Sequence, residues 1–358
     1  MKNQIIFISI IVVALCSCRK TNQSAMDLFT DKEEIQLLPD SFAFEKDSLA
    51  KPYLLTAIDS FLLVHDVFDM KHFTIFNAIT GKYVTRFGNI GTGPGELLVG
   101  NVLGICKKVV YSFDIPRSYI LKYNLKDIIN NDKSIPEVVA KFEYIPKTHL
   151  SRVISLGDSC FLGGGVYQSK YQYLLLDAKG DILDYGITIF NHQESFNDIH
   201  KFLSNQGILK NHPDGNKYVY SVNNSANIDF IEIVDGKLNL VKSHRLYNPQ
   251  FQNESFGNDA YSIDYKKNTI IGYIDISTSN EYVYTLYTDK TLVNDNGKSN
   301  RHSSDIILVF DWAGNPVKKY KLSQEVYYIT IDEEKKIFYA LLQDKEYNWD
   351  IVSFNIID

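Results

Sequence analysis

The stretch Asp305–Leu322, DIILVFDWAGNPVKKYKL, decides the fold of this chain. Ile306, Leu308 and Phe310 alternate with other residues, which is typical of a β-strand with one buried face. Residues Ala313–Pro316 then reverse the direction, and a second alternating run follows. The pattern therefore indicates an antiparallel hairpin. Three similar stretches begin at Phe73 (FTIFNAITGKYVTRFG), Tyr173 (YLLLDAKGDILDYGI) and Phe230 (FIEIVDGKLNLVKSHRL).

The turns of these hairpins share their chemistry. Each copy has Asp or Asn near the end of its first strand and Gly in or beside the turn. Asn and Gly tolerate the positive φ that tight hairpin turns require, so the repetition has a cause in the backbone. A hairpin repeated at long, loosely regular spacing is typical of radial β architecture.

Counting strands outward from these hairpins gives six units. Five units have four strands each, and the last has three, Val326–Ile331, Ile337–Leu342 and Asp350–Phe354. A three-stranded unit would leave an exposed edge, which native sheets avoid. The unpaired run Glu34–Glu45, EIQLLPDSFAFE, alternates well enough to be the missing strand. We therefore predict an all-β fold, a six-bladed β-propeller closed by an N-terminal strand in the last blade, with one helix at Glu194–Ser204.

The amino-acid composition supports a large β domain and argues against nucleic acid as a partner. Hydrophobic residues make up 45% of the 358 residues, and the 24 Tyr and 21 Phe favour strands over helices. The formal net charge is −6 at pH 7, and Lys and Arg form no basic stripe. Because phosphate binding rests on clustered basic residues, we expect no nucleic acid as a partner.

The first residues indicate the compartment. Lys2 precedes an apolar run, Ile5–Leu15, that is too short to span a bilayer. The run ends in Leu15-Cys16-Ser17-Cys18, which resembles a bacterial lipobox with Cys18 as the acylated residue. An ordinary signal peptide that ends near a Cys is the alternative. The lipobox implies a signal peptide over residues 1–17, a polar and structureless tether over 18–33, a propeller over 34–358, and a membrane partner through the lipid. Arg19 in place of Asp favours the outer membrane over the inner one.

Two further cysteines, Cys106 and Cys160, lie in different repeats beside apolar strand residues. An oxidising compartment would permit a disulfide between them. A disulfide needs Cα atoms within about 7 Å, which different repeats do not favour. We therefore predict two buried free thiols.

Two segments resemble a known family. The loop GNIGTGPGEL, Gly88–Leu97, resembles the GxGPGE signature of TolB-like six-bladed propeller lipoproteins. The run QGILKNHPDGNKYVYSV, Gln206–Val222, is similar to the fourth-blade entry of the same family. With the lipobox, the resemblance extends from Cys18 to the end of the chain. It implies a membrane-anchored, non-cytoplasmic propeller and carries over no catalytic residue.

The glycines of that loop are the first candidate site. Gly91, Gly93 and Gly95, with Gly88, could form a nest of backbone N–H groups that binds an anion. No Lys-Ser/Thr pair follows and no helix opens there, so the P-loop and dinucleotide patterns are absent and we expect no cofactor. The positive φ required at a crossing between blades explains the glycines equally well.

A second candidate is a group of metal-ligand residue types in the first repeat, His65, Asp66, Asp69 and His72. Two imidazoles and two carboxylates could hold zinc or a similar ion. Asp and His are also ordinary residues of solvent-facing turns, so a metal site and a polar turn are both open.

A third candidate is one face of the propeller. Arg117, Tyr119, Tyr167 and Tyr171, with Gln168 and Lys170, should project from turns of neighbouring blades on the face that carries Glu194–Ser204. Aromatic and Arg side chains there would suit a protein or a carbohydrate as partner. Structural filling of the loops is the alternative.

These observations favour a lipid-anchored binding or scaffolding propeller of the cell envelope. The alternative is a metal-dependent hydrolase or lyase with its site at the propeller axis. No G-x-S-x-G occurs and no Cys lies near a His, so nucleophilic catalysis finds no support. The starts of the innermost strands supply one carboxylate and two Asn, a thin set for an axial calcium ion, so an enzyme is disfavoured. Those starts are Tyr53, Asn101, Arg152, Gly207, Asn268 and Glu325.

Overall fold

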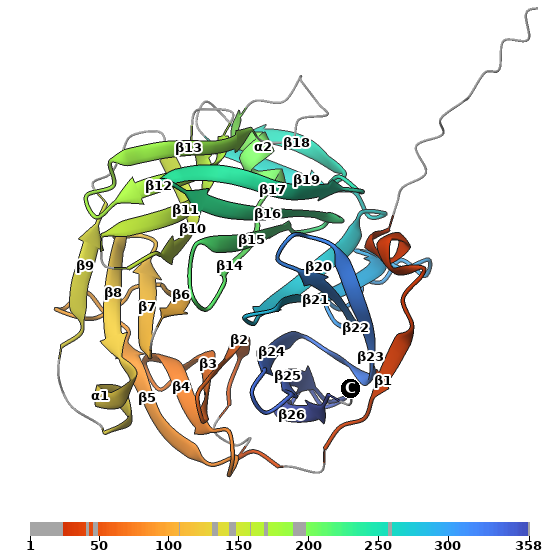
Figure 1. Cartoon of the computed structure of the whole chain (residues 1–358), viewed down its shortest axis with the longest axis horizontal. Helices are drawn as coiled ribbons and strands as arrows, with labels where there is room; N and C mark the ends of the chain where they lie inside the picture. The colour runs from red at the N-terminus through yellow and green to blue at the C-terminus, as the bar shows by residue number, and fades with distance from the viewer. Residues whose placement is uncertain are drawn as a thin grey trace, which may run out of the picture.

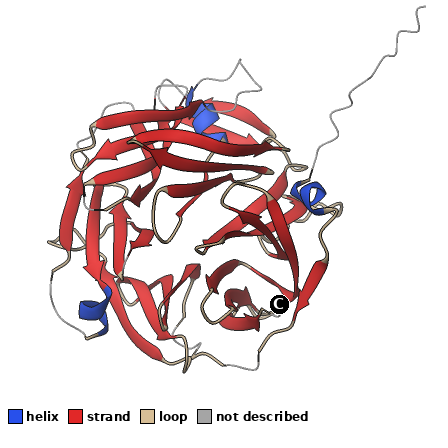
Figure 2. Ribbon diagram, viewed as in Figure 1, coloured by secondary structure: helices blue, strands red, loops and turns tan. Residues whose placement is uncertain are grey.

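The computed structural model describes residues 24–356 except 41–42, 46–48, 107, 131–134, 143–147, 158, 168–170, 189–197 and 257–259. Six antiparallel sheets stand around a central axis as the blades of a propeller (Figure 1). Nearly all the regular structure is strand, and the short helices lie at the rim (Figure 2). The predicted all-β, six-bladed fold is confirmed.

Within each blade the strands follow one another from the axis outward, in the order of the sequence. Blade one contains β2 (Pro52–Ile58), β3 (Phe61–Phe68), β4 (Lys71–Asn77) and β5 (Tyr83–Asn89). Blade two contains β6 (Gly100–Cys106), β7 (Val109–Asp114), β8 (Tyr119–Asn124) and β9 (Glu137–Lys141). Blade three contains β10 (Thr148–Ser155), β11 (Cys160–Tyr167), β12 (Tyr171–Asp177) and β13 (Ile182–Thr188).

The second half of the ring repeats the plan. Blade four contains β14 (Gly207–Asn211), β15 (Lys217–Val222), β16 (Asn227–Val234) and β17 (Lys237–Arg245). Blade five contains β20 (Ile270–Thr278), β21 (Tyr282–Thr291), β22 (Ser304–Asp311) and β23 (Pro316–Val326). Blade six has three strands, β24 (Tyr328–Asp332), β25 (Ile337–Gln343) and β26 (Trp349–Asn355).

The core lies between the faces of neighbouring blades. Between blades three and four, for example, the fully buried Tyr173 ring meets the Tyr220 ring at 5.4 Å between centroids. The Tyr173 hydroxyl donates a hydrogen bond of 2.7 Å to Asp229, which satisfies a polar atom in an otherwise apolar layer. Large aromatic side chains fill the wedge that opens between blades toward the rim, which explains the Tyr- and Phe-rich composition.

The N-terminal segment closes the ring. Strand β1 (Glu34–Leu37) pairs in parallel with β23 of blade five. Immediately afterwards Pro39 forms an antiparallel bridge with Phe354 of β26, and the Asp40 amide donates to the Ser353 carbonyl at 2.8 Å. The closing contact with the last blade is thus present, but the regular ladder lies on blade five. Pro39 has no N–H to continue a ladder, so the chain steps there from one blade edge to the next.

The tether was predicted wrongly in its second half. From Ser24 onward the chain is folded: η1 (Ala25–Phe29) begins with a capping box between Ser24 and Asp27. Phe29 is fully buried and packs edge-on against Phe310 of blade five at 5.0 Å between ring centroids. We call Ser24–Asp40 the docked N-terminal segment; it runs along the outside of blades five and six (Figure 1). The sequence feature that indicates this short helix is a pair of apolar residues four positions apart, Ala25 and Phe29.

Other elements lie outside the blades. Helix α2 (Asp198–Ser204) confirms the described part of the predicted helix; residues 194–197 lie outside the described residues. Helix α1 (Leu125–Ile129) and the hairpin β18 (Phe251–Phe256) with β19 (Ala260–Tyr265) were not predicted. Within the part of the chain that the structure describes, no helix is long and apolar enough to cross a membrane.

The cysteines are only partly described. Cys160 carries a free, half-buried thiol, and burial raises its pKa, which suits an unreactive core residue. Cys106 belongs to β6, and Cys16 and Cys18 lie outside the described residues.

Candidate functional site: the axial channel

The inner strands of all six blades surround a cavity of about 700 Å³ on the propeller axis. It runs from one face of the ring to the other, because residues from both ends of these strands line it. The lining comes from β2, β6, β10, β14, β20 and β24, with Gly104, Arg152, Lys210, Asp275 and Tyr328 among its residues. We call this cavity the axial channel.

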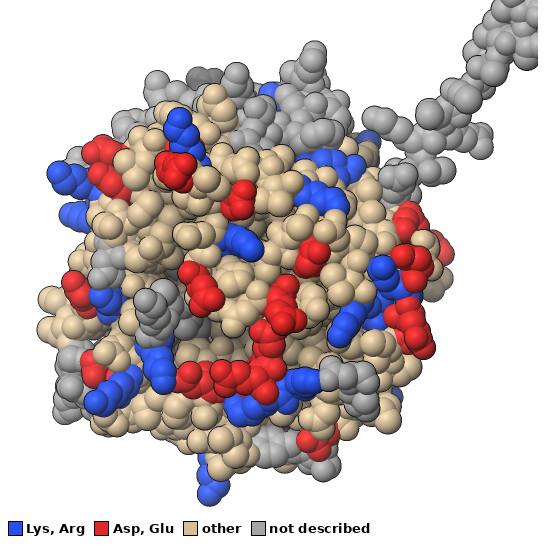
Figure 3. Space-filling view, viewed as in Figure 1, with Lys and Arg blue, Asp and Glu red and all other residues tan. Residues whose placement is uncertain are grey.

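The two mouths of the channel differ in charge. One mouth holds Tyr53, His65 and Tyr328, at the beginning of the inner strands. The other holds Asp59 and Lys108, whose charged groups pair at 2.7 Å. On the face of the ring seen in Figure 3, Lys and Arg side chains are interspersed with Asp and Glu, and several acidic side chains gather near the centre. No continuous basic area covers that face.

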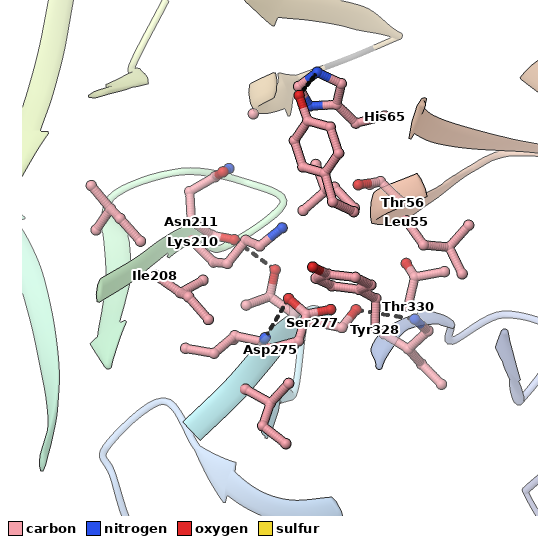
Figure 4. A pocket seen from close by; sticks show the side chains of 18 of the residues that line it. Leu55, Thr56, His65, Ile208, Lys210, Asn211, Asp275, Ser277, Tyr328 and Thr330 are labelled. Carbon is pink, nitrogen blue, oxygen red and sulfur yellow. Dashed lines mark hydrogen bonds between the residues drawn. The ribbon is translucent and has the colours of Figure 1, made fainter. Parts of the chain in front are cut away.

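Lys210 is the most unusual group in the channel. It lies on β14, between Leu209 and Asn211, and its amino group points into the open centre of the cavity (Figure 4). Within the described part of the chain the amino group has no hydrogen-bond or salt-bridge partner. Burial lowers the pKa of Lys210, Asp275 opposes this shift, and the Arg152 guanidinium adds to it.

Asp275 is the carboxylate of the same region. It is 2% exposed, and its two oxygens accept hydrogen bonds of 2.9 Å from the backbone amides of Ile276 and Ile329. Burial raises the pKa of Asp275 to about 6, although Lys210 and both amides act in the opposite direction. Because Ile329 belongs to β24, the carboxylate also joins the inner strands of blades five and six.

Other side chains hold the channel wall in place. Ser277 accepts a hydrogen bond of 3.0 Å from the Ile331 amide, and Thr330 accepts one of 2.8 Å from the Ala57 amide. Thr278 donates to the Asn211 carbonyl at 2.8 Å, which joins β20 to β14. Figure 4 shows the residues of this wall around the cavity. Since these bonds link four inner strands, the site has a rigid frame.

The tyrosine mouth is uncharged at neutral pH. Tyr53 and the His65 ring are hydrogen-bonded through the Tyr hydroxyl and Nε2. Burial raises the pKa of Tyr53 and of Tyr328 to about 12, and it lowers the pKa of His65 to about 3. Both phenols therefore remain neutral hydrogen-bond donors. The Tyr328 hydroxyl also points into the cavity (Figure 4), and it forms no hydrogen bond with the described residues.

The structure does not assemble His65, Asp66, Asp69 and His72 into a metal site. Asp66 is buried and its oxygens accept the amides of residues 50 and 51 at 2.9 and 2.6 Å. Asp69 lies exposed in the β3–β4 turn with φ of 51°. The two imidazole centroids are 5.9 Å apart, and His72 Nε2 meets the Leu97 carbonyl at 3.2 Å. Among the described residues no three His, Cys, Asp or Glu side chains converge.

The glycine loop, Gly88–Leu97, binds the carboxylate of one of its own residues, Glu96. The Gly93 amide donates to the Glu96 carboxylate at 2.8 Å, and a Cβ at Gly91 would lie only 2.0 Å from the same oxygen. At Gly95, with φ of 73°, a Cβ would lie 2.6 Å from the Pro136 ring. The carboxylate of Glu96 therefore lies where an external anion was predicted; Gly91 makes room for it, and Gly95 makes room for Pro136.

Arg117 and Tyr119 brace this loop. The Arg117 guanidinium pairs with Asp114 at 2.5 Å, donates to the Glu96 carbonyl, and stacks 4.3 Å from the centre of the Tyr119 ring. Tyr171 packs against Tyr185 with 5.0 Å between ring centroids. These contacts favour the structural alternative for the three side chains.

The rest of the predicted binding face is described only in part. The backbone of Tyr167 pairs with Thr148 in blade three. Gln168 and Lys170 lie outside the described residues.

Lys210 and Asp275 were missed from the sequence. Axial residues were expected only at the starts of the inner strands, whereas these two lie inside the strands, in GILKN and IIGYIDIST. A single charged residue within an otherwise uncharged inner strand was the available signal. In a propeller such a side chain can only face the axis or a neighbouring blade.

Comparisons with known proteins agree with the fold. The family model for TolB-like 6-blade propeller-like proteins matches residues 30–334. A structure from Bacteroides fragilis, of a protein described as exported, is 15% identical with a TM-score of 0.53, covering 91% of this chain and 95% of that chain. A DUF4221 family member from Bacteroides vulgatus is 12% identical with a TM-score of 0.59, covering 91% and 99%. No curated protein matches the chain.

Proposed function

The chain belongs to the TolB-like six-blade propeller family, and from this premise we propose that it is a lipid-anchored binding protein of the cell envelope. Its ligand is a small molecule that enters the axial channel. One observation carries the binding part: the Lys210 amine and the Tyr328 hydroxyl point into a cavity of about 700 Å³ and have no hydrogen-bond partner among the described residues. Polar groups that converge on a preformed cavity are typical of ligand sites.

The envelope location rests on the N-terminus and on the neighbours. We assign the acyl chains to Cys18 because the residues before it resemble a lipobox, and a structural neighbour described as exported supports the envelope location. Residues 19–23 separate Cys18 from Ser24, where the docked N-terminal segment begins. A chain of that length reaches roughly 20 Å, so the lipid would hold the propeller close to the membrane. Arg19 after the acylated Cys favours the outer membrane.

The axial channel is a better ligand site than the predicted binding face. The guanidinium of Arg117 is already bound to Asp114 and to the Glu96 carbonyl, so it has little left to offer a protein or carbohydrate partner. The channel instead presents polar groups held on a rigid frame. We therefore assign ligand binding to the channel.

The alternative of a metal-dependent hydrolase or lyase at the axis gains no support from the described lining. The described channel lining has two carboxylates. Asp275 accepts hydrogen bonds from two backbone amides, and Asp59 pairs with Lys108. A catalytic metal site needs at least three side chains that converge with an open position.

The anchor is tested by replacing Cys18 with Ala. Wild-type protein is expected in the membrane fraction, with an acylated Cys18 in the mass spectrum of its N-terminal peptide. The variant is expected to lack the acyl chains and to leave the membrane fraction. A wild-type N-terminal peptide without acyl chains would contradict the anchor.

Ligand binding is tested by filling the channel. Thr56 lines the cavity, and Thr56→Trp adds an indole there; Thr80→Trp, in the exposed β4–β5 turn, is the matched control. Native mass spectra of protein released gently from its own membranes should show a small-molecule adduct on wild type and on Thr80→Trp. The adduct should be absent from Thr56→Trp. Wild-type protein without an adduct, or an adduct that persists on Thr56→Trp, would contradict the proposal.

A further inference from the structure

We propose that one face of the propeller lies on the membrane that holds the lipid anchor, with an apolar patch of blades one and two in contact with the lipids. This inference rests on the proposed anchor and adds the orientation of the anchored protein. The patch consists of six exposed side chains, Val67, Phe68, Met70, Leu98, Val99 and Ile115. We call these residues the apolar patch.

The apolar patch lies at one face of the ring. Pro52 at the start of β2 pairs with Asp66 near the end of β3, so the inner strand begins at the face that carries the β3–β4 turn. We call this face the entry face, because the chain enters each blade there. Three patch residues lie at the end of β3 and in the turn after it, two lie just before β6, and one follows β7.

Backbone contacts make the apolar patch continuous across two blades. The Ile90 amide donates to the Met70 carbonyl at 2.9 Å, and Ile90 also bridges to Leu97, the neighbour of Leu98. The Leu98 amide donates to the Asp114 carboxylate at 2.9 Å, next to Ile115. The exposed fractions of the six side chains run from 36% for Ile115 to 67% for Met70. Large apolar side chains that gather on a surface in this way mark an interaction site.

The docked N-terminal segment begins at the same face. Ile270 at the start of β20 pairs with Thr291 at the end of β21, so the end of β21 lies at the entry face. The Ser24 hydroxyl donates to Asp289, two residues before that end, at 2.6 Å. Residues 19–23 connect Ser24 to Cys18 and reach roughly 20 Å when extended. The acyl chains on Cys18 therefore hold the entry face near the bilayer.

The linker is too short to place the opposite face on the membrane. β21 runs from Tyr282 to Thr291, and Tyr282 lies at the opposite face. With a rise of about 3.4 Å per residue, Tyr282 lies roughly 24 Å from Asp289 along the strand. Residues 19–23 fall short of that distance even when fully extended. A lipid surface is thus the occupant that the anchor brings to the apolar patch.

The opposite face carries charged groups in the turns that follow the inner strands. Asp59, between β2 and β3, pairs with Lys108 of the β6–β7 turn at 2.7 Å. Asp332 pairs with Lys335 in the β24–β25 turn, and the Lys335 amine also donates to the Asp59 carbonyl at 3.2 Å. Charged groups are costly to remove from water, whereas buried apolar area drives binding at a membrane surface. The opposite face therefore suits water, and the entry face suits lipid.

The test measures the contact of a single added tryptophan with lipid. Met70→Trp adds an indole to the apolar patch; Ile79→Trp, in the β4–β5 turn at the other end of the same blade, is the matched control, since Ile79 is 60% exposed. The full acylated protein is placed in vesicles of phosphatidylethanolamine and phosphatidylglycerol, with and without brominated acyl chains. After subtraction of the wild-type emission, bromine should quench Met70→Trp at least threefold more strongly than Ile79→Trp. Val99→Trp should behave like Met70→Trp.

Equal quenching at positions 70 and 79, or stronger quenching at position 79, would overturn the inference. A dimer in detergent that Met70→Asp dissociates would also overturn it, because a second copy would then cover the apolar patch. The mass spectrum of the N-terminal peptide reports the anchor separately. Acyl chains on Cys18 with equal quenching would keep the anchor and reject the orientation. Selective quenching at position 70 without acyl chains would reject the anchor and keep the membrane-facing patch.

Discussion

Replacing Phe29 with Ala is expected to lower the free energy of unfolding by about 3–5 kcal/mol. Phe29 lies at the end of η1, is fully buried, and packs against Phe310 of blade five. Its truncation would leave a cavity between the docked N-terminal segment and the ring. Because this segment also carries β1 and the bridge from Pro39 to Phe354, its release would open the edge of the last blade.

The matched control lies in the same segment. Leu38 is 74% exposed, so Leu38→Ala is expected to change the free energy of unfolding by less than about 0.5 kcal/mol. Denaturant unfolding of both variants, followed by tryptophan fluorescence, measures the difference. Equal stability of the Phe29 and Leu38 variants would show that residues 24–40 are a removable tail and not part of the ring closure.

The N-terminus shows how far sequence reasoning extends. The alternating run at Glu34 and the incomplete last blade were enough to predict closure of the ring. The position of the ladder on blade five was not predictable, because pairing between distant strands depends on the three-dimensional path of the chain. The burial of Phe29 was not predictable for the same reason, because Phe29 packs against residues of blades four and five that are distant in the sequence.

Asp275→Asn is expected to change the pH dependence of stability. Burial raises the pKa of Asp275 from 3.8 to about 6 in the folded protein. Between these values the folded state binds more protons than the unfolded state, so this group stabilises the fold below pH 4 and loses that effect as the pH rises past 6. A shift of about two pKa units corresponds to about 3 kcal/mol for a buried group.

The measurement is the difference in unfolding free energy between wild type and variant at several pH values. Asn has no carboxyl proton, so between pH 4 and pH 7 its stability should rise by about 2–3 kcal/mol relative to wild type. Asp214→Asn, in the exposed β14–β15 turn, is the matched substitution. A difference that stays constant with pH, or that moves in favour of Asp as the pH rises, would contradict the raised pKa.

The candidate site was less predictable than the fold. His65 and Tyr53 were singled out from the sequence and do lie at the channel mouth, but for reasons unrelated to metal binding. The glycine loop was predicted as a possible anion nest, and in the structure its Gly93 amide binds the carboxylate of Glu96 from the same loop. Lys210 and Asp275 are 65 positions apart in the sequence and come together only when blades four and five meet at the axis.

The most direct measurement of the central claim is a crystal structure of the protein released gently from its own membranes, with no ligand added. The account predicts density for a bound small molecule in the axial channel, within hydrogen-bond distance of Lys210 Nζ or of the Tyr328 hydroxyl. Density for a small molecule only on the outer faces of the blades, with solvent alone beside Lys210, would contradict the assignment of the channel as the ligand site.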